Sequence, residues 1–185
     1  MRLKNTEKNY GLLAILFHWI TAIGVFFLFG LGLWMTSLDY YHPDYRTAPH
    51  LHKSLGVLLI GLVIMRLLWR VMNPSPQALT THKTWEALVA KIVHAVLYIL
   101  LISLFISGYL ITTAEGDSLD VFSWFSLPSL IDGIKNLEDL AGEIHEWIAF
   151  TLIALVVLHA LAALKHHFLD KDSTLKRMFS TGEQQ

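Results

Sequence analysis

The sequence predicts an all-α integral membrane protein, a four-helix bundle whose N- and C-termini both lie on the inner side (N-in/C-in). Three observations predict it: 54% of the 185 residues are hydrophobic, only 16% are charged, and the apolar residues gather into four long runs. A soluble domain carries about 25% charged residues and has enough polar surface to cover its core. Lipid is therefore the expected cover, and we expect a single membrane-embedded domain over residues 1–185.

Four spans are expected at about residues 12–35, 52–72, 89–114 and 144–168. The first is free of formal charge and makes about 36 Å of helix, which is enough for a hydrocarbon core about 30 Å thick. It is too long for the apolar region of a signal peptide, so it is kept as mature structure. The other three carry their charged residues near their ends.

The positions of Lys and Arg predict the orientation of the spans. With both termini inside, eleven of the fourteen basic residues lie on the inner side and ten of the fifteen acidic residues on the outer side. The longer outer segment mixes acidic with aromatic and aliphatic residues, so we expect a cap lying partly on the membrane surface. The net charge of -1 gives no indication of nucleic-acid binding.

Cysteine is absent and histidine is frequent, with ten residues. The lack of thiols excludes disulfides, iron–sulfur clusters, thiolate zinc sites, covalently attached haem and thiol catalysis. Any metal must therefore be held by nitrogen or oxygen. Ionisable residues inside a membrane are costly, so the histidines within the spans are functional candidates.

Four histidines lie at two depths. His18 and His159 lie about 10 Å and 8 Å inside the inner ends of spans one and four, whereas His52 and His145 begin spans two and four at the outer end. His145 and His159 are 14 residues apart, close to four helical turns and about 21 Å, so they share one face. One helix can thus present one imidazole to each of two sites, an inner pair (His18, His159) and an outer pair (His52, His145).

Glycines leave room beside these histidines. Gly32 and Gly108 lie 14 residues after His18 and His94, at the level of the opposite site, and Gly56 lies one turn below His52. Space for a large flat ligand between paired neutral imidazoles predicts haem b held noncovalently. A single membrane histidine is more often an interhelical hydrogen bond, but zinc sites use three or four ligands in one place, so two pairs suit haem better.

The chain resembles the prokaryotic cytochrome b561 family over almost its whole length. The order and spacing of several short segments carry the resemblance: Leu16-Phe17-His18-Trp19, His52-Lys53-Ser54-Leu55-Gly56, Met65-Arg66-Leu67-Leu68-Trp69-Arg70, Asn73-Pro74-Ser75-Pro76, His94-Ala95-Val96-Leu97-Tyr98 and His159-Ala160-Leu161-Ala162-Ala163-Leu164-Lys165-His166-His167. It implies a multi-pass electron-transport cytochrome of the bacterial inner membrane with two haem b groups that exchange electrons with ubiquinone.

The resemblance assigns the inner haem iron to His18 and His159 and the outer one to His52 and His145. Within the family, a superoxide oxidase passes electrons from superoxide to ubiquinone. That activity requires an electropositive funnel to steer an anion, whereas the outer side of this chain is acidic. Lys53, beside His52, is the candidate outer anion site.

Three further residues are candidates near the inner pair. Arg66 shares the face of His52 and is expected to bind a haem propionate or quinone. His94 lies only two residues inside the third apolar run, too shallow for the inner haem by depth, so it is a candidate for quinone or propionate binding, or an interfacial histidine that snorkels. His166 is a candidate quinone-site residue at the inner surface, and His50 is the reserve if His52 is not a ligand.

Three functions remain open from the sequence. The first is a di-haem b oxidoreductase between the ubiquinone pool and a redox partner or superoxide at the outer, periplasmic face. The second is a haem-bearing anchor and electron-transfer subunit of a larger respiratory complex. The third is a His-lined ion or metal transporter. The expected partners are lipid, ubiquinone or ubiquinol and the outer redox partner, with a homo-oligomer left open and no nucleic acid.

Overall fold

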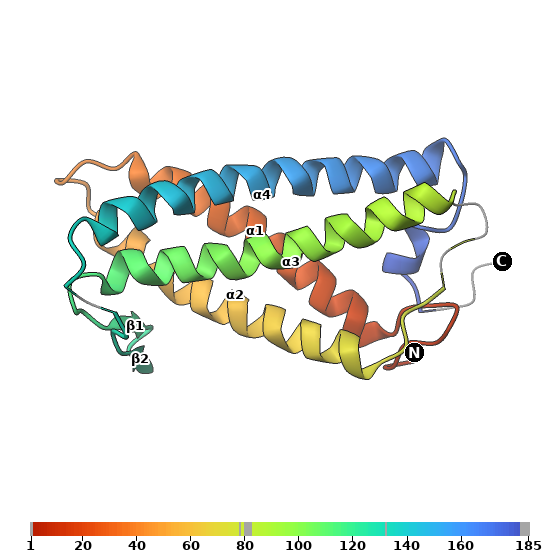
Figure 1. Ribbon diagram of the computed structural model, residues 1–185, viewed down its shortest axis with the longest axis horizontal. Helices are drawn as coiled ribbons and strands as arrows, with labels where there is room; N and C mark the ends of the chain where they lie inside the picture. Colours follow the sequence, from red (N-terminus) through yellow and green to blue (C-terminus); the bar gives the residue numbers. More distant parts are fainter. Residues whose placement is uncertain (1, 78, 80–82, 132, 182–185) are drawn as a thin grey trace. The chain divides into compact units, whose positions relative to one another are not determined.

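The computed structural model describes residues 2–77, 79, 83–131 and 133–181. The described residues form long α-helices and a small hairpin (Figure 1). The helices are α1 (Leu12–Thr36), α2 (Thr47–Met72), α3 (Thr84–Thr113) and α4 (Leu137–Phe168), followed by a short 3-10 helix η1 (Lys176–Met178). The hairpin joins α3 to α4 and pairs β1 (Leu119–Val121) with β2 (Phe125–Leu127) in antiparallel register. The predicted all-α class is confirmed, with this hairpin as the strand content of the described residues.

All four helices are long and apolar enough to cross a membrane, with a mean hydropathy of 2.1 to 2.4 in their most apolar windows. At most 17% of the residues in any of these windows are buried inside the protein. Large side chains such as Ile23, Ile99 and Leu158 are 61% to 67% exposed. Since so much apolar surface is costly in water, lipid must cover it.

Three helices begin earlier than the apolar runs predict. α2 begins at Thr47 with Pro49 in its first turn, where proline costs no hydrogen bond. α3 begins at Thr84, and the Glu86 carboxylate accepts a hydrogen bond at 3.0 Å from the amide of Lys83. α4 begins at Leu137 with acidic residues in its first turn, which suit the positive end of the helix dipole. Polar first turns therefore extend these helices beyond their apolar segments.

The chain forms two compact units, and each helix contributes a segment to both. The central unit comprises Ile23–Gly61 and Ile99–Ile153, and the terminal unit comprises Met1–Ala22, Leu62–Tyr98 and Ala154–Gln185. Each unit contains one segment of each of the four long helices. In the central unit, for example, Phe29 of α1 contacts Phe150 of α4 with ring centroids 5.4 Å apart.

The terminal unit also contains the C-terminal segment, which packs on α1. The Trp19 indole donates a hydrogen bond to the carbonyl of Met178 at 2.6 Å, and its ring lies 4.8 Å from that of Phe179. Phe17 of α1 contacts Trp69 of α2 at 6.5 Å between centroids. These contacts surround the α1 turn that contains His18.

Candidate functional site

The outer pair lies in the central unit. His52 of α2 and His145 of α4 face each other with ring centroids 6.2 Å apart and planes at 69°. Both rings are partly buried. The Nδ1 atom of His52 is buried and makes no hydrogen bond within the part of the chain described.

The tautomer of His145 follows from its hydrogen bonds. Its Nδ1 atom lies 3.0 Å from the carbonyl oxygen of Leu104 and 3.1 Å from the hydroxyl of Ser107, both on α3. A carbonyl can only accept, so Nδ1 carries the proton and Nε2 keeps a free lone pair. A histidine that binds a metal usually donates its other N–H to a carbonyl in this way.

Two glycines make room for the rings of the outer pair. A Cβ atom at Gly32 of α1 would lie 3.3 Å from Cε1 of His52. One at Gly108 of α3 would lie 3.0 Å from Cε1 and 3.2 Å from Nδ1 of His145, tighter than ordinary contact. A Cβ at Gly56 would meet no atom within 4 Å. Gly32 and Gly108 therefore lie at the level of the outer pair, as the 14-residue spacing predicts, and a side chain at either position would press on a histidine ring.

The inner pair lies in the terminal unit and has a similar spacing. His18 of α1 and His159 of α4 have ring centroids 6.4 Å apart and planes at 66°. A third ring, that of His94 on α3, lies 5.1 Å from that of His159. The Nδ1 atom of His94 lies 2.6 Å from the carbonyl oxygen of Ala90, so it carries the proton and its Nε2 can accept one.

His94 lies beside the inner pair, although its place near the start of the third apolar run predicted a shallower position. α3 begins at Thr84, ahead of that run, so His94 is ten residues, about 15 Å, from the start of its helix. Its ring is closer to that of His159 than the His18 ring is, 5.1 Å against 6.4 Å.

Arg66 and Tyr98 complete the surroundings of the inner pair. The Arg66 guanidinium donates a hydrogen bond at 2.9 Å to Nδ1 of His18, and its Cζ lies 5.5 Å from the centre of the Tyr98 ring. Arg70, one turn later on α2, lies 5.8 Å from the same ring. Tyr98 had no predicted role, although a polar aromatic residue one turn after His94 indicates that the two side chains lie on the same face of the helix.

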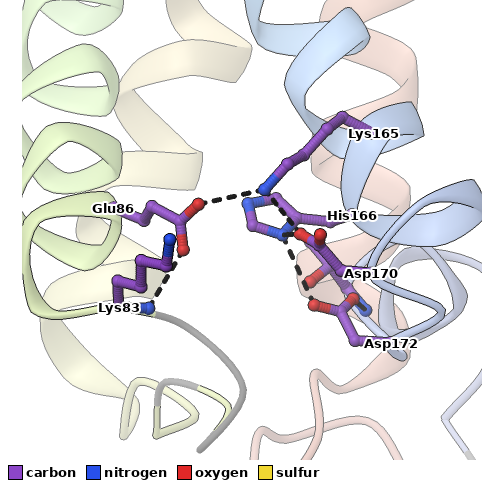
Figure 2. Close-up of polar contacts among 7 residues, drawn as sticks. Lys83, Glu86, Lys165, His166, Asp170 and Asp172 are labelled. Atoms are coloured by element: carbon purple, nitrogen blue, oxygen red, sulfur yellow. Dashed lines mark hydrogen bonds and ion pairs between the residues drawn. The ribbon is translucent and has the colours of Figure 1, made fainter.

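His166 contacts carboxylates near the end of α4, as Figure 2 shows. Its Nδ1 lies 2.7 Å from Asp170 and 3.5 Å from the nearly buried Asp172. The Lys165 ammonium links Glu86 of α3 to Asp170 at 3.0 Å and 2.7 Å. Glu86, His166 and Asp170 have donor atoms within 4.8 Å of one another, as a metal site would, but the ammonium of Lys165 already supplies positive charge there.

Lys53 and His50 lie in the first turns of α2, on either side of His52. Lys53 is partly buried. The His50 ring contacts Phe122 of the hairpin loop at 6.3 Å between centroids. Because residues two apart on a helix point about 200° apart, His50 and His52 face different neighbours.

The comparisons with known proteins decide the family. A family model described as prokaryotic cytochrome b561 matches residues 9–181. The chain belongs to the prokaryotic cytochrome b561 family. It is therefore a membrane electron-transfer cytochrome with an oxidoreductase role, and membership implies a haem b cofactor.

Three relatives cover nearly the whole chain. "Cytochrome b561 homolog 2" of Escherichia coli K12 is 46% identical over 178 residues, 96% of this chain and 95% of that protein. "Probable superoxide oxidase CybB" of Yersinia pestis is 30% identical over 173 residues, 93% of this chain and 96% of the relative. "Cytochrome b561 homolog 1" of Escherichia coli K12 is 28% identical over 167 residues, 89% and 93% of the two chains.

The donor set of this b561 cytochrome fits haem b. Two imidazole nitrogens each about 2 Å from one metal ion place their ring centroids about 6 Å apart, and the outer and inner pairs measure 6.2 Å and 6.4 Å. Gly32 and Gly108 lie directly against the rings of the outer pair, so the absence of a side chain there lets the two imidazoles take these positions. Histidine nitrogen is also an axial haem ligand that requires no cysteine, which this chain lacks.

Proposed function

We propose that this protein is a di-haem b oxidoreductase of the bacterial inner membrane that moves electrons between ubiquinone and a redox partner at the outer face. His52 and His145 hold one haem iron, and His18 and His159 hold the other. The observation that carries the proposal is the pair of matched histidine spacings, 6.2 Å and 6.4 Å. When bound, each haem supplies a one-electron carrier.

The chain's own residues suit a quinone site next to the inner pair. Ubiquinol loses two protons with its two electrons, so the site needs a proton acceptor beside the haem. His94 provides one, because its Nδ1–H is held by Ala90 and its Nε2 is a free acceptor. Arg66 and the Tyr98 hydroxyl provide donors for the quinone oxygens.

Arg66 has a second role that follows from the tautomer of His18. A guanidinium only donates, so the bond between Arg66 and Nδ1 of His18 leaves the neutral ring protonated at Nε2. To serve as a ligand through Nε2, His18 must move this proton to Nδ1, where it repels the guanidinium. Arg66 is then released to pair with an anion such as a propionate carboxylate.

Superoxide is a second candidate for the outer electron donor. The observation in its favour is the 30% identity to a relative named "Probable superoxide oxidase CybB", together with Lys53 beside His52. The surrounding exposed acids of the central unit oppose the approach of an anion. Rapid haem reduction by superoxide that slows as salt rises would indicate a local positive site at Lys53 and favour this donor.

Decylubiquinol tests the proposed function directly. We expect it to reduce the oxidised haems of the purified full-length protein within seconds, followed as the rise of the α-band absorbance, because His94 and Arg66 provide the proton acceptor and donor that the reaction requires. Dithionite-reduced protein should in turn be reoxidised by decylubiquinone. Haem that is fully reducible by dithionite but inert to both quinone forms would contradict the proposal.

A further inference from the structure

The hairpin β1–β2 is fixed to α2 by one buried serine. Ser54 is completely buried, and its hydroxyl accepts a hydrogen bond from the amide of Phe122 at 3.1 Å and donates one to the carbonyl of Asp120 at 3.4 Å. Leu119 and Val121 of β1 are only 2% and 0% exposed. The hairpin is therefore packed against the helices rather than hanging from them.

The hairpin loop has an unfavourable backbone that its surroundings must hold. Phe122 and Ser123 have φ angles of 47° and 61°, a region that residues with a Cβ seldom adopt. Such conformations persist where neighbouring contacts fix them and are found most often at functional sites. Here they present Trp124, 70% exposed, with its ring 5.3 Å from that of Phe122.

Four apolar side chains in and just after the hairpin are exposed and are called the hairpin patch: Trp124, Phe125, Leu130 and Ile131. Leu130, 79% exposed, is also held in place, because the Tyr109 hydroxyl of α3 accepts a hydrogen bond from its amide at 3.0 Å. Exposed apolar side chains on a fixed backbone, with tryptophan at the centre, are typical of protein-binding sites.

The exposed charges of the central unit are mostly negative. Its exposed basic residues are Arg46 and Lys135. Its exposed acidic residues among those the structure describes are Asp39, Glu115, Asp117, Asp120, Glu138, Asp139, Glu143 and Glu146. Three of these acids adjoin the hairpin in the chain, since Glu115 and Asp117 precede β1 and Asp120 lies in it. Negative charge beside exposed apolar side chains attracts a basic protein and repels an anionic lipid surface.

The hairpin patch is tied to α2 and α3, two of the helices at the outer pair. Ser54 follows His52 by two residues on α2, and Tyr109 follows Gly108, whose Cβ position abuts the His145 ring. The hairpin patch is therefore connected through Ser54 and Tyr109 to the helix segments that contain His52 and Gly108.

We propose that the hairpin patch is the docking surface for a small soluble one-electron carrier protein with a lysine-rich face. This rests on the proposed function, since the carrier exchanges its electron with the haem held by His52 and His145. In each encounter with an oxidised carrier, ferrous haem iron becomes ferric and the carrier gains one electron. No bond is formed or broken, and no proton is transferred.

Mitochondrial ferricytochrome c, a lysine-rich carrier, is the probe, and its succinylated form is the negatively charged control. Full-length protein is reduced with dithionite, freed of excess reductant and mixed with each probe in a stopped-flow instrument. We expect the native probe to react at least about tenfold faster than the succinylated one at low salt. The ratio of the two rates should fall about tenfold when salt rises from about 10 mM to about 200 mM, because salt screens the electrostatic attraction between the probe and the acidic residues.

Two sets of variants distinguish the loss of docking from the general effect of removing a tryptophan or an acidic charge. Trp124→Ala should slow the native probe about tenfold, whereas Trp147→Ala, at an equally exposed tryptophan of α4, should not. The double variant Glu115→Gln/Asp117→Asn should lower the low-salt rate and flatten its salt dependence. Glu7→Gln, a neutralised exposed acid of the terminal unit, is its control.

Equal rates for the two probes, or a Trp124→Ala rate equal to that of the wild type at low salt, would overturn the proposal. Quenching of Trp124 fluorescence by brominated lipid would also overturn it, because lipid would then occupy the patch. The reaction starts from chemically reduced haem, so it does not depend on quinone. Loss of decylubiquinol oxidation with intact carrier docking would contradict the proposed function alone.

Discussion

His145→Ala is expected to remove one of two haem b components from the reduced-minus-oxidised spectrum and to lower the haem content from about two to about one per chain. The hydrogen bond to Leu104 holds the His145 ring with Nε2 as its acceptor atom, and a noncovalent haem bound there would be lost with the imidazole. His52→Ala should remove the same component. His18→Ala and His159→Ala should remove the other.

His42→Ala is the control, because His42 lies in the loop between α1 and α2 with 38% of its side chain exposed. It should leave both components in place. The proposed pairing would be wrong if His52→Ala and His159→Ala removed the same component. A third outcome is equally informative: if His94→Ala removed the inner component and His18→Ala did not, His94 would be the partner of His159.

Substitution of His94 or Arg66 is expected to slow the reduction of haem by decylubiquinol about a hundredfold, with both haems retained. The reason is the loss of the proton acceptor or donor at the quinone site, since general acid–base groups contribute about a hundredfold or more to such steps. The variants are His94→Gln and Arg66→Met, and the measurement is the stopped-flow rate together with the haem content.

Arg70→Gln is the matched control for Arg66. Its guanidinium lies at nearly the same distance from Tyr98, 5.8 Å against 5.5 Å, and it belongs to the same helix. Its rate should stay within about twofold of wild type, because the predicted donor is the group that also contacts His18. If Arg70→Gln slowed haem reduction as much as Arg66→Met does, the loss of one positive charge would explain both effects. The assigned role of Arg66 as the donor would then be wrong.

The sequence predicted what depends on helical periodicity. The 14-residue interval between His145 and His159 places both on one face of α4 whatever the loops do, and the structure brings them to His52 and His18 respectively. Gly32 and Gly108 were predictable for the same reason. The pattern of apolar runs also predicted the four helices and their order.

The sequence could not predict what depends on helix starts and loops. The contact between the His94 and His159 rings was not predicted, because the position of His94 in its apolar run does not give the level at which α3 packs against α4. The carboxylates that contact His166 come from the turn after α4, whose path no periodicity encodes. The hairpin could not be foreseen either, because Phe122 and Ser123 are not residues that signal a left-handed backbone.

The central claim is that two haem b groups are held by two histidine pairs in one chain. The most direct test is the haem content of the purified wild-type protein, measured by the pyridine haemochrome method against polypeptide determined by amino-acid analysis. The structure predicts about two haem b per chain, one for each histidine pair with its spacing of 6.2 Å or 6.4 Å. A value of one haem per chain in a fully loaded preparation would contradict it.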